Sequence, residues 1–354
     1  MSRSARAAGS ASPVRRATVT APANIAFVKY WGARDLARAV PVNPSISMTL
    51  ARCVSRTSVE RLDGAGADEV WLAAGPAEVG AAAAAPIDPG EAFRRRVTAH
   101  LGELRRRLGV EGQRYRVTTA NSFPAAAGIA SSASGFAALA VAVAAVAGRQ
   151  AAPEELSALA RASGSGSASR SVLGGYVEWP APGSPEDDPR AVQLAPADHW
   201  DLRDVIAVVE SGAKEVSSLD GHRRAASSPH FARRLELLPE RLRRVRRAIA
   251  ERDVHALGET IEEEAIELHL VAMSSHPPVY YWNPGTVEVL AAVRALRASG
   301  VPAWSTMDAG ANVHVLCPPE AEEAVAERLG RVAAVERLIR DGVGAGPRVE
   351  EVVE

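Results

Sequence analysis

The feature that most constrains the fold is an apolar run of twelve residues, Phe136 to Ala147, which follows a segment rich in Ser, Ala and Gly. A helix that crosses a bilayer needs about 20 apolar residues, so this run is too short to span a membrane. A helix that is apolar on every side has to be surrounded by protein. The run therefore predicts a buried helix inside a globular domain, started by the small residues before it.

The loop before this helix, Ser122 to Gly135, consists mostly of small side chains. Small side chains let the backbone approach a ligand closely, and Gly128 permits dihedral angles that other residues resist. The first N–H groups of a helix lack partners within the helix, and the helix dipole is positive there. Such a terminus binds phosphate without a lysine. The loop therefore indicates a phosphate site; the structural alternative is a serine-capped turn before a core helix.

We predict that this loop binds the phosphates of ATP. The hydroxyls of Ser131 and Ser132 are candidate contacts for the Mg²⁺ that accompanies the nucleotide. The Gly-Lys-Ser/Thr pattern of P-loop NTPases is absent, which excludes that class. The residues expected to contact ATP are Pro124, Ala127, Gly128, Ala130, Ser131, Ser132 and Ser134.

A second loop, Gly164 to Ser171, combines glycines and serines with one arginine, Arg170. An arginine presents a two-pronged donor to a carboxylate or phosphate, so this segment can hold an anionic substrate. It lacks the third glycine of a dinucleotide fingerprint. The segment taken alone is equally consistent with a solvated linker.

Composition limits the partners. Of the 354 residues, 41 are basic and 42 acidic, for a net charge of −1, so no overall attraction to nucleic acid or an anionic membrane is expected. The arginine-rich stretch 241–247 is interpreted as a solvated helix face. Cys53 and Cys317 lie far apart and make no metal-type pair, which is typical of a reducing cytoplasm. These observations predict a cytoplasmic protein that acts on a small molecule.

The length predicts two domains that share a cleft. Proline-rich residues 180–196 are the candidate boundary, which gives a disordered tail over 1–16, an N-terminal domain over 17–185 and a C-terminal domain over 186–354. Alternating strands and helices indicate an α+β or α/β protein. Predicted helices include 91–108, 153–162, 232–252 and 254–273, and predicted strands include 17–21, 115–119 and 313–317.

Three segments carry a family resemblance: Pro22 to Gly32 with its Lys-Tyr-Trp-Gly sequence, the 124–135 loop, and Met307 to Val313 with its Asp-Ala-Gly-x-Asn sequence. In this order they resemble the GHMP kinase superfamily and, within it, the diphosphomevalonate decarboxylase branch. The resemblance implies an α+β fold with an N-terminal α/β domain, a ferredoxin-like C-terminal domain and an active site between them. It also implies ATP and Mg²⁺ as cofactors, and a homodimer, since dimers are common in the family.

The resemblance further implies a reaction and roles. ATP phosphorylates the tertiary 3-hydroxyl of a phosphorylated mevalonate, and loss of CO₂ and phosphate gives an isopentenyl product. The positions that match catalytic residues of the family are Asp308, Lys29 and Arg170, and those that match substrate contacts are Tyr30, Ser165, Ser167 and Arg170.

Two positions depart from the family pattern. Ala33 stands where a second lysine usually neutralises the substrate diphosphate, and Leu219 stands where relatives often have a basic residue. Fewer cations favour a tail of smaller charge, so 5-phosphomevalonate is an alternative to 5-diphosphomevalonate. A mevalonate-type kinase without decarboxylation is the other alternative within this fold.

Overall fold

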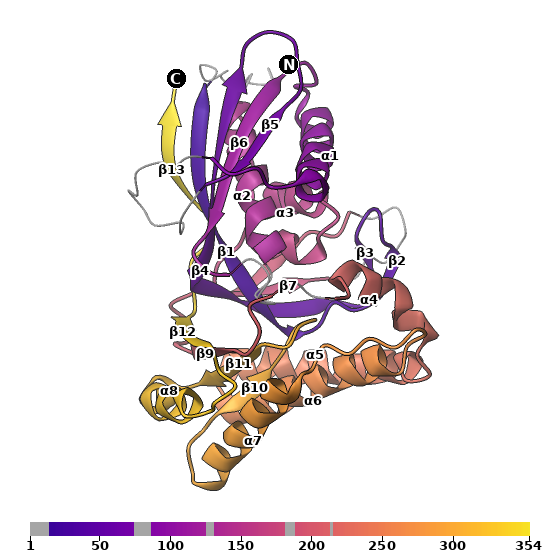
Figure 1. The fold of residues 1–354 in the computed structure, drawn as a ribbon, viewed down its shortest axis with the longest axis vertical. Coiled ribbons are helices and arrows are strands. Elements are labelled where there is room, and N and C mark those ends of the chain that lie inside the picture. Colours follow the sequence, from indigo (N-terminus) through magenta and orange to yellow (C-terminus); the bar gives the residue numbers. More distant parts are fainter. Residues whose placement is uncertain (1–13, 74–85, 125–130, 181–187, 213–214) are drawn as a thin grey trace, which may run out of the picture.

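The computed structural model describes residues 14–73, 86–124, 131–180, 188–212 and 215–354. Figure 1 shows two lobes stacked along the long axis, each built of a β-sheet and helices. This arrangement agrees with the predicted α+β class. The first strand begins at Arg16, which lies within the segment predicted to be a tail, whereas residues 1–13 of that segment lie outside the described residues.

The first lobe contains a seven-stranded sheet in which β13–β1–β4–β6–β5 are neighbours, while β7 pairs with both β4 and β8. The pairs are antiparallel except for β5 and β6. Helices cover the sheet face that carries the larger apolar core. The strands are β1 (Arg16–Val28), β4 (Ser45–Leu62), β5 (Glu69–Leu72), β6 (Arg114–Asn121), β7 (Tyr176–Trp179), β8 (Val192–Ala195) and β13 (Arg348–Val353), with the separate hairpin β2 (Ala33–Asp35) and β3 (Val40–Pro41).

The central helix of this lobe is α2 (Ser131–Val146), and almost every side chain from Ala133 onward is buried. This confirms the buried helix predicted from the apolar run. It packs between the sheet and the flanking helices α1 (Glu91–Leu108) and α3 (Pro153–Arg161). Within the described ranges, no helix is both long and apolar enough to cross a bilayer.

The second lobe has a four-stranded antiparallel sheet in the order β10–β11–β9–β12. With its helices it follows the β-α-β-β-α-β pattern of ferredoxin-like folds, as predicted. Its strands are β9 (Arg203–Val208), β10 (Trp304–Thr306), β11 (Val313–Cys317) and β12 (Arg337–Gly342); its helices are α4 (Ser218–Arg224), α5 (Phe231–Glu251), α6 (Val254–Met273), α7 (Pro284–Ala298) and α8 (Glu322–Gly330). Short 3₁₀ turns are Gly166–Ser169, Ala225–Ser227 and Pro319–Ala321.

The lobes do not divide at residue 185. Strands β8 and β13 both follow that residue, yet both belong to the first sheet. The range predicted for the C-terminal domain, 186–354, therefore contains two strands that belong to the first lobe. The long strand β4 also reaches toward the second lobe, where the Asp341 carboxylate accepts N–H bonds from Ala51, Arg52 and Cys53 at 2.8–2.9 Å. Proline content marks a local break in the chain. It cannot show that a later strand, β13, returns to pair with β1 in the first sheet.

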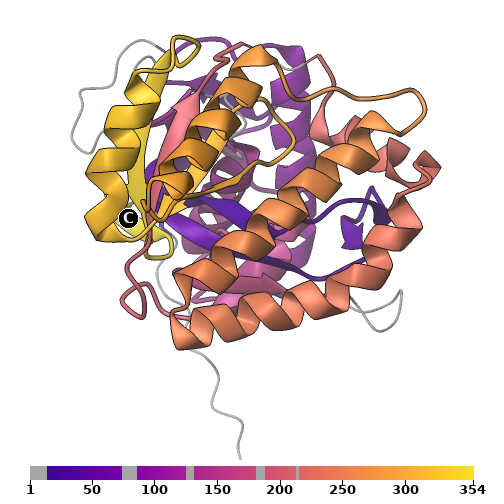
Figure 2. The same ribbon diagram turned by 90° about the horizontal axis from the view of Figure 1, so that it is seen from below.

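Helices α5 and α6 pack side by side beneath the lobe junction, as Figure 2 shows. Arg241 of α5 is buried, and its Nη1 donates to Glu264 at 3.0 Å and to Glu267 at 2.6 Å on α6. The interpretation of 241–247 as a wholly solvated face is therefore wrong at Arg241. The carboxylates of α6 stabilise the buried guanidinium, because a charged group can be buried only when it is paired.

Candidate active site between the lobes

A cavity of about 410 Å³ lies between the lobes and is lined by residues from both. It brings together the side chains of Lys29 and Asp308, which are 279 residues apart in sequence. The predicted site residues that line it are Lys29, Tyr30, Ser131, Ser132, Ser165, Ser167, Arg170 and Asp308. The two loops and the Asp-Ala-Gly segment thus meet at one place.

The predicted ATP contacts are placed unevenly. Ser131 and Ser132 open helix α2 and line the cavity, and Pro124 ends the described segment before the loop. Ala127, Gly128 and Ala130 lie outside the described residues.

Ser134 is the exception among the serines of this segment. Its hydroxyl is fully buried, lies 2.6 Å from that of Ser55 on β4 and donates to the Ser131 carbonyl. The helix turns this hydroxyl toward the sheet, so the side chain does not support the predicted contact of Ser134 with ATP, which stays a prediction.

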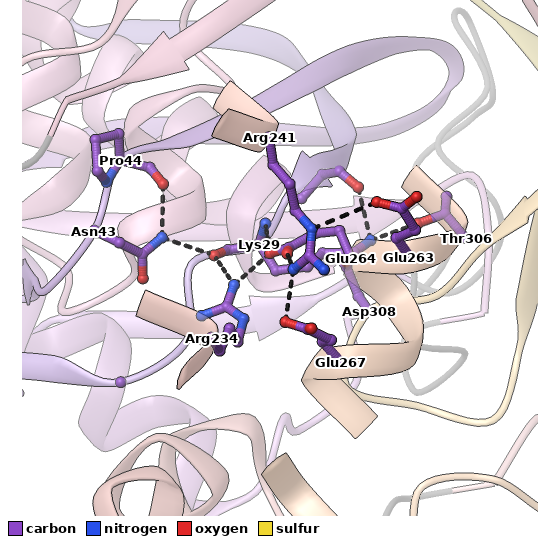
Figure 3. A network of polar contacts seen from close by, with 12 residues as sticks. Lys29, Asn43, Pro44, Arg234, Arg241, Glu263, Glu264, Glu267, Thr306 and Asp308 are labelled. Atoms are coloured by element: carbon purple, nitrogen blue, oxygen red, sulfur yellow. Dashed lines mark hydrogen bonds and ion pairs between the residues drawn. The ribbon is translucent and has the colours of Figure 1, made fainter. Parts of the chain in front are cut away.

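The Lys29 ammonium and the Asp308 carboxylate form an ion pair, with 2.9 Å between Nζ and Oδ1. The ammonium also donates to the Ala26 carbonyl at 2.6 Å and to the Thr306 hydroxyl at 2.8 Å. The Lys29 side chain is 2% exposed, whereas that of Asp308 is 27% exposed. Both residues line the cavity, and Asp308 is the more exposed partner of the pair. Figure 3 shows the pair together with Thr306.

Burial and charge act in opposite directions on this pair. Burial by itself raises the pKa of the Asp308 carboxyl, but the Lys29 ammonium, with His314 and Arg170, brings that pKa below its ordinary value. Burial lowers the pKa of the Lys29 ammonium, and Asp308 opposes that shift. Asp308 is therefore ionised at neutral pH and is suited to accept a proton.

Side chains from both lobes hold the backbone of Lys29. Its N–H donates to the Glu264 carboxylate at 3.0 Å, and its carbonyl accepts from Arg234 at 2.9 Å and from Asn43 at 3.0 Å. Arg234 also pairs with Glu264, and both are buried (Figure 3). These three residues escaped prediction from the sequence, where the one available signal is an acid on the buried face of helix 254–273.

Arg170 is a buried cation whose bonds are all to neutral groups. It donates to Ser47 at 2.9 Å, to Ser45 at 2.5 Å and to Asn24 at 3.2 Å. Burial lowers the pKa of its guanidinium to about 10, so it stays charged at neutral pH. It forms no ion pair with any described residue. A buried cation without a protein anion provides a place for a ligand anion.

The Gly164–Ser171 loop is packed against the protein, so the linker alternative is wrong. It forms a 3₁₀ turn at Gly166–Ser169, and Gly166 is essential to its placement. A Cβ there would come within 2.5 Å of the Trp179 ring and 2.7 Å of the Tyr30 ring. The hydroxyls of Ser165 and Ser167 are hydrogen-bonded to each other at 3.2 Å, which places two adjacent hydroxyl groups at the cavity.

A group of residues around Tyr30 forms another part of the cavity wall. The Tyr30 ring lies 5.2 Å from that of Trp179 and 4.3 Å from that of His222. Leu219, which is 43% exposed, lines the cavity one turn before His222 on α4. Ala33 lies in β2 and is half-buried. Among described residues, the cations that line the cavity are Lys29, Arg96 and Arg170.

A second cavity of about 290 Å³ adjoins the first and shares Arg96, Ser131 and Ser132 with it. Most of its wall is apolar. It is lined by Leu72, Phe93, Val97, Val117, Phe136 and Leu139, with polar groups at Thr57, Thr119 and Asn121. Its position at the start of α2 makes room for a flat apolar group attached to a phosphate chain.

Two protein-family models match the chain. Residues 21–191 match a diphosphomevalonate decarboxylase-like N-terminal domain, and residues 204–349 match a mevalonate 5-diphosphate decarboxylase C-terminal domain. A diphosphomevalonate decarboxylase from Candida albicans is 33% identical, covering 94% of this chain and 97% of its own length. One from Aspergillus fumigatus is 37% identical, covering 90% of this chain and 81% of its own length.

Solved structures agree in fold. Mevalonate diphosphate decarboxylase from Staphylococcus aureus superposes with a TM-score of 0.86 at 31% identity, covering 96% of this chain and 98% of its own. A structure described as MDDEF in complex with MVAPP, AMPPCP and magnesium has a TM-score of 0.85 at 33% identity, covering 96% and 99%.

Proposed function

The chain belongs to the diphosphomevalonate decarboxylase family, and from this premise we propose that it carries out the ATP-dependent decarboxylation of 5-diphosphomevalonate to isopentenyl diphosphate. The observation that carries the proposal is the single cavity that joins the start of α2 to Asp308, Lys29 and Arg170. A reaction of this kind needs a phosphate-binding terminus, a base and a carboxylate-binding cation within reach of one small substrate.

The proposed reaction has two stages. ATP, when bound, supplies the phosphoryl group that turns the tertiary 3-hydroxyl into a phosphate ester. The bond between C1 and C2 then breaks, its electron pair forms the C2–C3 double bond, and the C3–O bond releases phosphate. The products are CO₂, ADP, phosphate and the isopentenyl diphosphate. The first stage is needed because hydroxide is a poor leaving group.

Asp308 is proposed to orient the 3-hydroxyl and accept its proton. It lines the cavity and its carboxylate is kept ionised by Lys29 at 2.9 Å, and a positioned carboxylate is a common general base. The ammonium also places positive charge where negative charge develops on the oxygen during transfer. Glu264 and Arg234 hold the backbone of Lys29, which keeps that charge in place.

Arg170 is proposed to hold the substrate carboxylate. The serines and asparagine around it fix the direction of the guanidinium without neutralising it. This arrangement orients C1 before the bond to C2 breaks. Tyr30, Ser165 and Ser167 line the same cavity and are proposed as contacts for the rest of the substrate.

The described residues fit a nucleotide and its metal. Ser131 and Ser132 stand at the first turn of α2, where helix N–H groups and the helix dipole favour phosphate, and the adjoining apolar cavity suits a nucleobase. In the described part of the chain, no three acidic, histidine or cysteine side chains gather as a metal site. The serine hydroxyls therefore suit Mg²⁺ that takes its other ligands from phosphate oxygens and water.

A side-by-side assay tests the proposal. Purified protein is given ATP, Mg²⁺ and mevalonate, its 5-phosphate or its 5-diphosphate, and ADP and CO₂ are measured together. We expect equal amounts of ADP and CO₂ with the diphosphate. ADP without CO₂ would instead identify a kinase, and neither product would refute an enzymatic role of this kind.

A second candidate substrate is 5-phosphomevalonate, which would give isopentenyl phosphate. The specific observation is that Leu219 lines the cavity and that Ala33 follows Trp31, another lining residue, by two positions. The family usually has a lysine at the position of Ala33 and often has a basic residue at that of Leu219. A tail with one phosphate needs less positive charge around it. The same assay distinguishes the two substrates.

If the missing cation matters, Ala33→Lys is expected to shift preference toward the diphosphate. A partly exposed charge pair contributes about 1 kcal/mol, so the ratio of kcat/KM for diphosphate over monophosphate should rise about fivefold. Arg34→Lys, the adjacent exposed position, serves as the control and should leave the ratio unchanged. An equal ratio in Ala33→Lys and the natural protein would contradict this account of Ala33.

Assembly and location complete the proposal: a cytoplasmic homodimer that acts on small molecules without a nucleic-acid partner. The near-zero net charge supports the absence of a polyanion partner. Sedimentation equilibrium tests the dimer, and a single species of 37.1 kDa would overturn it.

A further inference from the structure

His222 forms part of a site whose residues are linked by direct contacts. Its ring lies 4.3 Å from that of Tyr30 and 4.8 Å from that of Trp31, and Gly166 packs closely against Tyr30. All four residues line the cavity. We call the part of the cavity formed by Tyr30, Ser165, Ser167, Leu219 and His222 the tail site.

The hydrogen bond to Gly32 determines which nitrogen of His222 carries the proton. The Gly32 N–H donates to Nδ1 at 3.0 Å. A backbone N–H can only donate, so Nδ1 has to be an unprotonated acceptor, and the proton of a neutral imidazole is then on Nε2. Gly32 takes a positive φ of 82°, which glycine adopts without strain. The Lys-Tyr-Trp-Gly turn thus fixes the tautomer.

The ring is also kept uncharged. Burial and the nearby Arg234 guanidinium lower the pKa of His222 to about 3. Nε2 makes no hydrogen bond to any described residue, while the rings of Tyr30 and Trp31 hold the imidazole in place. His222 therefore offers a single oriented N–H donor without a positive charge.

We propose that Nε2–H of His222 donates a hydrogen bond to a phosphate oxygen of the substrate tail, so that an uncharged donor does part of the work that cations do in relatives. This inference rests on the proposed function, because it places the phosphorylated end of the substrate in the tail site. A neutral donor recognises phosphate through hydrogen-bond geometry. Its contribution to binding therefore depends less on the negative charge of the tail than that of an ammonium group would. Such a donor serves a monophosphate and a diphosphate alike.

Ligand binding without catalysis tests the donor. Mevalonate, its 5-phosphate and its 5-diphosphate are titrated calorimetrically into the natural protein, His222→Phe and His222→Gln. Phe keeps a ring beside Tyr30 but has no N–H, whereas the Gln amide can still donate. We expect His222→Phe to lose about tenfold in affinity for both phosphorylated ligands and none for mevalonate, and His222→Gln to recover most of the loss.

His255→Phe is the matched control, since that ring packs edge-on against Trp304 at 5.0 Å and is not among the residues that line the cavity. It should leave all three affinities unchanged. Unchanged affinities in His222→Phe, or an equal loss for mevalonate itself, would overturn the proposal.

A second measurement uses the natural protein and does not depend on a variant that folds. In a ¹⁵N spectrum of the imidazoles at pH 7.5, His222 is expected as the Nε2–H tautomer, and its Nε2 signal should shift with 5-diphosphomevalonate but not with mevalonate. A protonated Nδ1, or an Nε2 signal that does not shift with 5-diphosphomevalonate, would refute the role of His222 as a donor to the substrate tail. If this shift occurs without CO₂ release in the assay above, the proposed function fails while the tail site stands.

Discussion

Asp308→Asn is expected to lower kcat about 1,000-fold, the middle of the range for loss of a general base, while leaving affinity for nucleotide within about threefold. An amide cannot accept the proton of the 3-hydroxyl, and it no longer pairs with the Lys29 ammonium at 2.9 Å. The nucleotide contacts proposed at the start of α2 belong to a different element and should not be altered. Steady-state kinetics of ADP release and calorimetric titration with a non-hydrolysable ATP analogue measure the two effects.

Asp220→Asn provides the control for this variant. That carboxylate lies on α4, pairs with Arg223 at 2.6 Å and is partly exposed to solvent, so its loss should leave kcat unaffected. Near-normal turnover in Asp308→Asn would exclude this carboxylate as the base. A matching loss of nucleotide affinity would instead point to a distorted site.

Arg170→Gln is expected to reduce kcat/KM by about 30- to 1,000-fold, which corresponds to roughly 2–4 kcal/mol for removing one member of a buried charge pair. The guanidinium has no carboxylate partner among the described residues, so its removal does not leave a buried carboxylate without its ion-pair partner. Folding should therefore be affected much less than catalysis. Thermal unfolding and kinetics with the diphosphate substrate separate the two.

Arg246→Gln is a suitable comparison because that arginine also pairs across elements, with Glu178 on β7 at 2.6 Å, but does not line the cavity. It should retain full activity. Arg170→Lys is expected to recover only part of the loss, because an ammonium cannot reproduce the fixed fork that Ser45, Ser47 and Asn24 orient. A loss below threefold in Arg170→Gln would rule out its proposed role.

The sequence predicted local structure well where a periodic pattern had a clear end. The helices at 91–108 and 254–273 and the strand at 313–317 have the bounds expected. Leu108 is followed by Gly109 in a left-handed conformation that ends the helix. The meeting of Lys29, Arg170 and Asp308 could be anticipated only through the family motifs, because nothing local relates residues so far apart.

Other parts of the site could not be predicted because they depend on tertiary environment. Glu264 looks like any acid on a helix, and its role comes from the Lys29 N–H and Arg234 that reach it from other elements. Ser134 resembles Ser131 and Ser132 in sequence, yet the hydroxyl of Ser55 lies against it in the core. His222 acquires its fixed tautomer only from the turn at Gly32.

The pairing of the first strand with the last has a consequence for biosynthesis. Strand β13 covers one edge of β1, from Arg16 beside Val353 to Thr20 beside Arg348. While the chain is being made, β1 leaves the ribosome long before its neighbour exists, and an uncovered strand edge can pair with another chain. Completion of the first sheet therefore has to wait until β13 has left the ribosome, and nascent chains cut short before β13 would be the ones most prone to aggregate.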